Sequence, residues 1–230
     1  MKFKTKLLQG ILVKRYKRFF VDIKYKNKII TCHCPNSGSM LGLLNQGSKV
    51  WFSESDNIKR KLKYTLEIIE VEKKMVGINT LKTNKIVLEA LNENKINNLT
   101  KFNNIKTEAK FSDNTRFDFF LSNKNEKCFL EVKNVTLLRK NKVAEFPDAI
   151  TTRGTKHLVE LINAKKKGFS SYILYLIQRE DCKFFKIAED LDQEYKITFD
   201  KALKNGVKVL CYDCKLSNEE IKLNNPIYYE

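Results

Sequence analysis

Two carboxylates and one lysine lie on neighbouring apolar segments of this chain, at a spacing that suits phosphate chemistry. Asp118 lies in segment 116–121, and Glu131 and Lys133 lie in segment 128–135. Alternate side chains of a strand point to the same face, so Glu131 and Lys133 share one face. If the two segments pair as an antiparallel hairpin, Asp118 lies roughly opposite Glu131. The three ionisable groups would then meet within a few ångströms.

Two acids this close repel each other unless a cation lies between them. A hard divalent ion such as Mg²⁺ or Mn²⁺ prefers oxygen ligands and is usually held by one or two carboxylates with waters. Lys133 could position or help to deprotonate a water, or offset charge that develops on a phosphate. The spacing Asp-x12-Glu-x-Lys is the signature of metal-dependent PD-(D/E)xK nucleases, so we expect Asp118, Glu131 and Lys133 to be catalytic. An ordinary ion pair on the solvent face of a strand is the alternative.

Helical and strand segments alternate after residue 83, and their order predicts a mixed sheet covered by helices. The clearest helix spans 151–167, because apolar residues recur at helical spacing before Gly168. The nearly continuous apolar run 171–178 is typical of a strand buried on both faces. The expected helices are 84–94, 151–167 and 199–205, and the expected strands are 105–111, 115–121, 128–135, 171–178 and, as the last one, 207–212.

The first 80 residues have a different pattern, which predicts a small β-barrel. Short strands alternate with turn signals, and Pro35 and Gly38 mark a loop. About five strands with one short helix are typical of an OB-like barrel. The fold class is therefore α/β (α+β), with an OB-like domain at 1–82 and a nuclease-like domain at 83–230. The expected strands of the barrel are 7–13, 19–25, 28–34, 48–54 and 63–72, and the expected short helix is 39–45.

The chain is strongly basic, and the excess is concentrated in its first third. It carries 44 Lys and Arg against 27 Asp and Glu, a net charge of +17, and residues 1–80 alone hold 17 against 6. A basic surface favours polyanions through phosphate neutralisation and counterion release. A composition typical of an A+T-rich genome would also be rich in lysine. Nucleic acid is the expected partner, and nothing in the sequence separates DNA from RNA.

Three basic clusters are candidates for contacts with nucleic acid. Two lie in loops of the first domain beside aromatic residues, an arrangement found in single-strand-binding barrels. The third opens the helix at 151–167, where residues three and four apart share a face near free backbone N–H groups. Solvated surface charge is the alternative for each cluster. The candidate residues are Arg15, Arg18, Lys59, Arg60, Lys61, Arg153, Lys156 and His157.

Cysteine usage indicates a reducing compartment, and the hydropathy of the N-terminus bears on the location of the protein. Six cysteines in a chain of this size indicate free thiols and not a disulfide framework. Cys211 and Cys214 form a lone CxxC pair, and a structural zinc that joins them to Cys32 and Cys34 is one alternative. No long apolar segment follows the basic N-terminus, so we expect no signal peptide, no membrane partner and a cytoplasmic protein.

Longer motifs at five places in the chain point to one known family. They read HCPNSGSM at 33–40, SDNIKRKL at 55–62, GINT at 77–80, EVKNVTL at 131–137 and FPDAITTRGTKHL at 146–158. Together and in this order they resemble the sugar fermentation stimulation protein A family, essentially from end to end. The resemblance implies an N-terminal OB-like domain, a C-terminal PD-(D/E)xK nuclease-like domain and DNA binding, with a regulatory role in sugar (maltose) metabolism.

The resemblance also implies particular site residues. It places Asp118, Glu131 and Lys133 at the nuclease positions, and it places Glu89 at the acidic position of the first helix. Mg²⁺ or Mn²⁺ would then be held by Asp118, Glu131 and Glu89, while the role of Glu108 stays open. We expect a DNA-binding protein with a metal-dependent nuclease centre. The alternatives are a DNA-binding regulator of sugar-metabolism genes that no longer cuts, and a nuclease directed at RNA.

Overall fold

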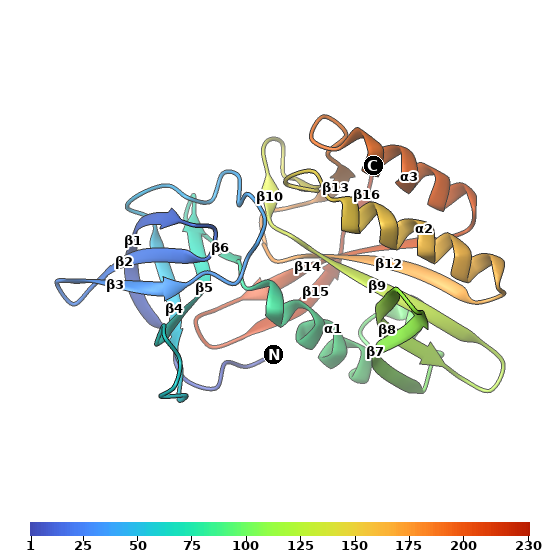
Figure 1. Ribbon diagram of the computed structural model, residues 1–230, viewed down its shortest axis with the longest axis horizontal. Coiled ribbons are helices and arrows are strands. Elements are labelled where there is room, and N and C mark those ends of the chain that lie inside the picture. Colours follow the sequence, from blue (N-terminus) through green and yellow to red (C-terminus); the bar gives the residue numbers. More distant parts are fainter.

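In the computed structural model, which describes all of residues 1–230, the short strands of the first third close into a barrel (Figure 1). These strands are β1 (Leu8–Tyr16), β2 (Phe20–Tyr25), β3 (Lys28–His33), β4 (Lys49–Glu54), β5 (Tyr64–Val71) and β6 (Lys74–Gly77). Their order is β3-β2-β1-β4-β5-β6, and a further pairing of β3 with β5 closes the barrel. Alternate side chains point inward, so apolar residues such as Val21 and Ile23 are fully buried. The predicted OB-like barrel is confirmed.

The remaining chain forms a mixed sheet with helices on both faces (Figure 1). Helix α1 (Thr83–Asn92) covers one face, and α2 (Thr152–Lys166) and α3 (Gln193–Lys204) cover the other. The sheet strands are β7 (Asn104–Ser112), β8 (Thr115–Ser122), β9 (Lys127–Val135), β12 (Ser170–Ile177), β14 (Lys208–Leu216) and β15 (Ile221–Pro226). In the order β15-β14-β12-β9-β8-β7, the three central strands are parallel and the outer ones antiparallel.

Strand β12 shows why both faces of this sheet need a cover. Leu174 and Leu176 pack into the cluster that contains the buried face of α1. Ile173 and Tyr175 point to the opposite face and pack with residues of α2 and α3. All four side chains are completely buried. A strand enclosed on both sides has no polar face, which explains the continuous apolar run in the sequence.

Three expectations about secondary structure are wrong. Segment 39–45 forms turns and not a helix, because Met40 has a φ of 55° and Gly42 a φ of 77°. Helix α3 begins at Gln193, well before 199, where the Asp192 carboxylate caps it by accepting the N–H of Tyr195 at 3.0 Å. Strand 207–212 is not the last, since β15 follows it. The sequence also gave no sign of β10 (Leu137–Leu138), β11 (Val143–Phe146), β13 (Phe184–Ile187) and β16 (Tyr228–Tyr229), which form a small second sheet.

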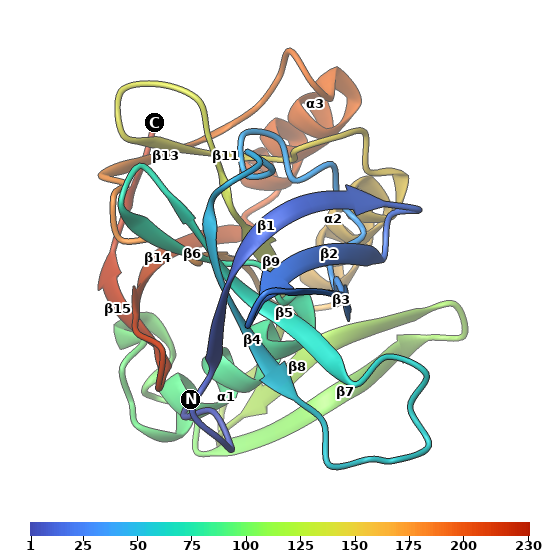
Figure 2. The same cartoon turned by 90° about the vertical axis from the view of Figure 1, so that its left-hand side faces the viewer.

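The barrel and the sheet domain share part of one core. Leu7, Trp51 and Ile68 of the barrel belong to the same buried cluster as α1 and the sheet. The N–H of Gly77, at the end of β6, donates to the carbonyl oxygen of Gln178 at 2.9 Å. A Cβ on Gly77 would lie 2.4 Å from the Gln178 side chain, so only glycine fits this close approach. Figure 2 shows the barrel packed directly in front of α1 and the sheet.

Two short 3-10 turns flank helix α1. The turn η1 (Thr80–Lys82) leads directly from the barrel into α1, and η2 (Asn97–Leu99) follows it. The side chain of Asn79 caps η1 by accepting the N–H of Leu81 at 3.1 Å. None of the helices has the length and apolar character needed to cross a membrane.

Candidate active site

Strands β8 and β9 form the predicted antiparallel hairpin, and its acids lie where regular pairing ends. The last recorded pair is Phe119 with Leu130, and Asp118 and Glu131 are the next residues in this register. At this point the carboxylate of Asp118 takes the place of a backbone acceptor in the pairing of the two strands, because its Oδ2 accepts the N–H of Val132 at 2.7 Å. The predicted juxtaposition of the two acids is therefore present in the structure, one step beyond the last pair.

Asp118 is half-buried, and two donors hold its carboxylate. Besides the bond from Val132, the Nδ2 of Asn84 in the first turn of α1 donates to its Oδ1 at 2.7 Å. Burial and the negative charge of Glu131 raise the pKa of Asp118 to about 6. The two hydrogen bonds and the charge of Lys133 act in the opposite direction. A further cation beside these acids would relieve the repulsion between them.

Glu131 is the most enclosed member of the cluster, with 3% of its surface exposed. Its Oε1 accepts a bond from the Nζ of Lys133 at 2.7 Å and also contacts the Nδ1 of His157. Burial acts to raise the pKa of Glu131, but Lys133 and His157 outweigh it and lower this pKa below its ordinary value. The other carboxylate oxygen, Oε2, is buried and has no hydrogen-bond partner in the protein. An unpaired buried carboxylate oxygen is costly, so it is suited to a ligand.

The side chain of His157 extends from α2 to this cluster. It is 8% exposed, and its Nδ1 lies 3.5 Å from the Nζ of Lys133. Its ring packs edge-on against Phe117, with centroids 6.4 Å apart. We expected His157 to lie with the residues that contact nucleic acid, but the structure places it against Glu131. Helical spacing could have indicated this, because His157 lies four residues before Leu161 on the buried face of α2.

Glu89 does not reach the cluster, which corrects the expectation that it is a third metal ligand. Its carboxylate accepts a bond from the Met1 ammonium group at 2.5 Å. Asn84 is the residue of α1 that faces Asp118, and Glu89 follows five positions later on a different side of the helix. Glu108 is exposed on β7. The structure contains no group of three or more His, Cys, Asp or Glu arranged to hold a metal ion.

Asp118 and Glu131 nevertheless fit a hard divalent cation as a site with two carboxylates. Mg²⁺ keeps several of its waters and is commonly bound through only one or two carboxylates. The unpaired Oε2 of Glu131 and the raised pKa of Asp118 both indicate negative charge that a cation would balance. Lys133 is 13% exposed, more than Glu131, so its ammonium group can meet a substrate from solvent.

The basic residues predicted to contact nucleic acid have different environments. Arg15 has a structural role, because its guanidinium donates to the main-chain carbonyls of residues 18, 36, 38 and 39 at 2.8–3.2 Å. Arg60 donates to the hydroxyl of Thr65 at 3.0 Å. Arg153 and Lys156 lie on the exposed side of α2, on the turns that carry His157. Among the eight candidate residues, the exposed ones are Arg18, Lys59, Arg60, Lys61, Arg153 and Lys156.

A polar cleft of about 380 Å³ lies between the barrel and the sheet domain. The loop after β3 and the loop before α2 form two of its walls, and both belong to the long sequence motifs. The Oδ2 of Asp148 accepts the N–H of Met40 at 2.9 Å, which ties the two loops together. Asn134 and Thr151 also line the cleft. It therefore opens at the ends of the strand that carries Lys133 and of the helix that carries His157.

The cysteines do not form a metal site. All six are free and buried. Cys211 and Cys214 both lie on β14, but they belong to the clusters on opposite faces of the sheet, so they cannot bind one ion together. Cys32 and Cys34 lie in the separate core of the barrel. The alternative of a zinc ion that joins the two pairs is therefore wrong.

Family models and relatives match almost the whole chain. A model described as "Sugar fermentation stimulation protein RE domain" matches residues 81–220, and one described as "SfsA N-terminal OB domain" matches residues 13–78. A "Sugar fermentation stimulation protein homolog" of Pelagibacter ubique is 52% identical over 99% of this chain and 98% of its own. A homologue of the same description from Maricaulis maris is 42% identical over 100% of this chain and 99% of its own.

One solved structure is similar over the same extent. It is described as "The structure of Pyrococcus Furiosus SfsA in complex with Ca2+", and it covers 100% of this chain and 98% of that one. The TM-score is 0.90 at 23% sequence identity, so the likeness establishes a shared fold. This supports the architecture of a barrel followed by a mixed sheet with helices on both faces.

Proposed function

The chain belongs to the sugar fermentation stimulation protein family, and from this premise we propose that it is a DNA-binding, divalent-metal-dependent phosphodiesterase. One observation carries the proposal: Asp118 and Glu131 lie side by side with Lys133, and one buried oxygen of Glu131 has no partner. A purely structural ion pair would satisfy its buried carboxylate on both oxygens. The arrangement instead resembles an electrostatic site prepared for a cation and a phosphate.

Asp118 and Glu131 would hold Mg²⁺ or Mn²⁺, with waters completing the coordination. When bound, the ion would polarise a phosphate oxygen and lower the pKa of a bound water. The relative from Pyrococcus furiosus is described in complex with Ca²⁺, an ion that also prefers oxygen ligands, and this supports a divalent cation here. Glu89 has no part in this proposal because its carboxylate is bound to the Met1 ammonium.

Three further groups have roles in the proposed reaction. Lys133 offsets the negative charge that develops on the phosphate, since its ammonium lies at the edge of the cluster. His157 positions the Glu131 carboxylate from the side of α2. Arg153 and Lys156 bind neighbouring phosphates of the strand, because both are exposed near the start of the same helix.

The barrel supplies most of the affinity for the polyanion in this proposal. The first 80 residues hold 17 Lys and Arg against 6 Asp and Glu, and OB barrels commonly bind single strands. The cleft between the domains leads from the barrel to the ends of β9 and α2, so one strand could contact both domains. DNA is the proposed substrate, and RNA is tested beside it.

A second candidate function is a DNA-binding regulator of sugar-metabolism genes that does not cut. The observation that favours it is the position of Glu89, because only two carboxylates remain in the cluster. Metal dependence separates the two functions: a binding module that recognises phosphate through Arg and Lys needs no divalent ion. Cleavage, in contrast, requires a divalent ion, since the two acids alone repel a phosphate.

The test is cleavage of labelled single- and double-stranded DNA and RNA with Mg²⁺, with Mn²⁺ and with a chelator. Wild type is compared with Asp118→Asn, and a gel-shift measurement with the same DNA accompanies each assay. Metal-dependent cutting by wild type alone supports the phosphodiesterase and identifies its substrate. Binding without cutting by either protein supports the regulator. Equal cutting by both contradicts the role proposed for Asp118.

A further inference from the structure

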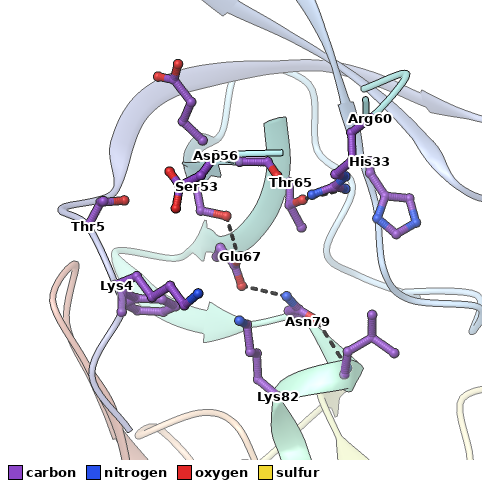
Figure 3. A pocket seen from close by; sticks show the side chains of 14 residues that line it. Lys4, Thr5, His33, Ser53, Asp56, Arg60, Thr65, Glu67, Asn79 and Lys82 are labelled. Carbon is purple, nitrogen blue, oxygen red and sulfur yellow. Dashed lines mark hydrogen bonds between the residues drawn. The ribbon is translucent and has the colours of Figure 1, made fainter. Parts of the chain in front are cut away.

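A second polar pocket, of about 400 Å³, lies in the barrel domain (Figure 3). Its walls come from the N-terminal segment, the end of β4 with the loop after it, the start of β5, and Asn79, Leu81 and Lys82 before α1. It shares no lining residue with the cleft between the domains. Only two of its fourteen lining residues are hydrophobic, so its ligand is polar. None of the proposed catalytic residues belongs to it.

A buried carboxylate, Glu67, lies at the centre of this pocket. It is 2% exposed, its Oε1 accepts the hydroxyl of Ser53 at 2.7 Å, and its Oε2 accepts the Nδ2 of Asn79 at 2.7 Å. Burial raises the pKa of Glu67, whereas its hydrogen bonds from Ser53 and Asn79 and the charges of Lys82 and Arg60 favour the ionised form. Each carboxylate oxygen has two acceptor positions. One position on each oxygen is therefore left for a ligand.

Cationic groups surround this acceptor pair. Figure 3 shows the side chains of Lys4 and Lys82 directed toward Glu67 from one side, with Arg60 and His33 on the other. Burial and the positive charge of Arg60 lower the pKa of His33, so its ring is neutral at pH 7 and adds no charge. The carboxylates of Glu54 and Asp56 also line the pocket, and Glu54 pairs with Lys63 at 2.6 Å. The pocket thus combines a buried pair of acceptors with three cations and one further unpaired carboxylate. This pattern suits a ligand that carries two adjacent N–H donors and a phosphate.

We propose that this pocket binds a guanine nucleotide, with the base on Glu67 and the phosphate on Lys82 and Lys4, which lie on the same side of the pocket. Guanine is the common base whose Watson–Crick edge presents two adjacent N–H donors, and a carboxylate accepts both. Adenine and cytosine present a ring acceptor beside a donor, which an ionised carboxylate repels. A pocket of about 400 Å³ is within the size range of small-ligand sites.

Such a nucleotide could be free in solution or could be one unpaired guanine of a strand bound to the barrel. Both sources present the same base edge and a phosphate, so they are distinguished by experiment. Asn79, Leu81 and Lys82 line the pocket, and this segment leads directly into α1, where Asn84 holds Asp118. The inference goes beyond the proposed phosphodiesterase, and it is tested without divalent metal so that its failure is separate from a failure of cleavage.

The test is isothermal titration calorimetry of the full chain in a buffer that contains a chelator. GMP and AMP are titrated first, followed by an oligothymidylate with one central guanine or one central adenine. We expect GMP to bind at least about tenfold more tightly than AMP. If the natural ligand is part of a strand, the oligonucleotide with guanine also binds more tightly than the one with adenine. If the free nucleotide is the ligand, only the mononucleotides differ.

Glu67→Gln keeps the shape of the side chain but turns one acceptor into a donor. We expect it to remove the preference for GMP over AMP, a change of about tenfold. Glu70→Gln is the matched control, because Glu70 lies on the same strand and pairs with Lys49 at 3.4 Å outside the pocket. Lys82→Met should weaken the binding of GMP but not that of guanosine, since it removes a contact to the phosphate alone.

Three outcomes would overturn the inference. The first is no binding of GMP or of the guanine oligonucleotide by wild type up to about 1 mM. The second is equal binding of GMP and AMP by wild type, a comparison that needs no variant to fold. The third is a folded Glu67→Gln protein, checked by its thermal unfolding, that retains the preference for GMP. In that last case the role of Glu67 is structural: on β5, it accepts hydrogen bonds from Ser53 of β4 and from Asn79.

Discussion

The Nδ2 of Asn84 donates a hydrogen bond of 2.7 Å to the Oδ1 of Asp118, so the first turn of α1 holds one of the two acids of the candidate active site. Asn84 lies two residues after the turn η1, which follows the last strand of the barrel. The position of this acid therefore depends on the junction between the domains and not only on the hairpin that carries it.

Asn84→Ala should raise the pKa of Asp118 above about 6. The bond from Asn84 stabilises the charged carboxylate and so lowers this pKa. Without it, burial and the charge of Glu131 raise the pKa further. The measurement is the titration of the Asp118 carboxyl carbon by NMR in metal-free protein. Lys85→Ala, at the next and exposed position of α1, is the control and should leave this pKa unchanged. An Asp118 pKa that stays near 6 or falls in Asn84→Ala would show that the bond is weak in solution.

The stability of the metal-free protein should fall as the pH rises through about 6. Asp118 has a folded-state pKa raised from 3.8 to about 6, so its contribution is fully present below pH 3.8 and is lost as the carboxyl ionises in the folded state. The loss is of the order of 2–3 kcal/mol, from about 1.4 kcal/mol for each pKa unit. Urea unfolding at a series of pH values measures it.

Asp118→Asn should remove the loss of stability that the Asp118 carboxyl causes as the pH rises. It should also remove stabilisation by Mg²⁺ or Mn²⁺. A cation that binds the folded chain raises the melting temperature by mass action, and it needs both acids. Wild type should therefore melt at a higher temperature when metal is added at pH 8, whereas Asp118→Asn should not respond. Equal metal-induced shifts in the two proteins would place the cation at another site.

His157→Ala and Lys156→Ala should separate a buried role from a surface role on one helix. Removal of His157 takes away a buried partner of Glu131 and should destabilise the protein by about 1–3 kcal/mol in urea unfolding. Lys156 is exposed, so its loss should leave stability within about 0.5 kcal/mol. Lys156→Ala should instead weaken DNA binding and reduce the slope of log K against log salt by about 1. The reverse pattern would assign His157 to the nucleic-acid surface.

Gly77→Ala should destabilise the contact between the domains by about 1–3 kcal/mol, because its Cβ would overlap the Gln178 side chain at 2.4 Å. The second change Gln178→Ala removes the closest atom, Oε1, and leaves the Cβ at 3.2 Å, so the double variant should recover part of the loss relative to the sum of the single variants. Strict additivity of the two single effects in urea unfolding would mean that the backbone moves apart instead.

The sequence predicts the elements that carry the acids, because strand alternation and the turn between two apolar runs are local signals. Asp118, Glu131 and Lys133 meet as the pattern indicates. Glu89 shows the limit of this reasoning: a helix can be recognised from its apolar stripe, but its rotation against the sheet depends on packing. Asn84 carries no charge and belongs to no motif, so nothing in the sequence distinguishes it as the partner of Asp118.

The small second sheet was missed for a related reason. Strand β10 has two residues and β11 four, too few for a period to be visible. Strand β11 then pairs with β13, and β13 with β16, and both of these strands lie far away in the sequence. The left-handed turn at Met40 is likewise fixed by its tertiary surroundings, because its N–H is held by Asp148 from the other domain.

The shared core makes the barrel an inseparable part of the protein rather than a detachable module. Leu7, Trp51 and Ile68 would become exposed if the chain were divided after residue 82, and the matching face of α1 would lose its cover. Two exposed apolar surfaces of this kind favour aggregation over independent folding. Evolution cannot readily exchange this barrel for another domain, because any replacement would have to rebuild the other half's interior as well.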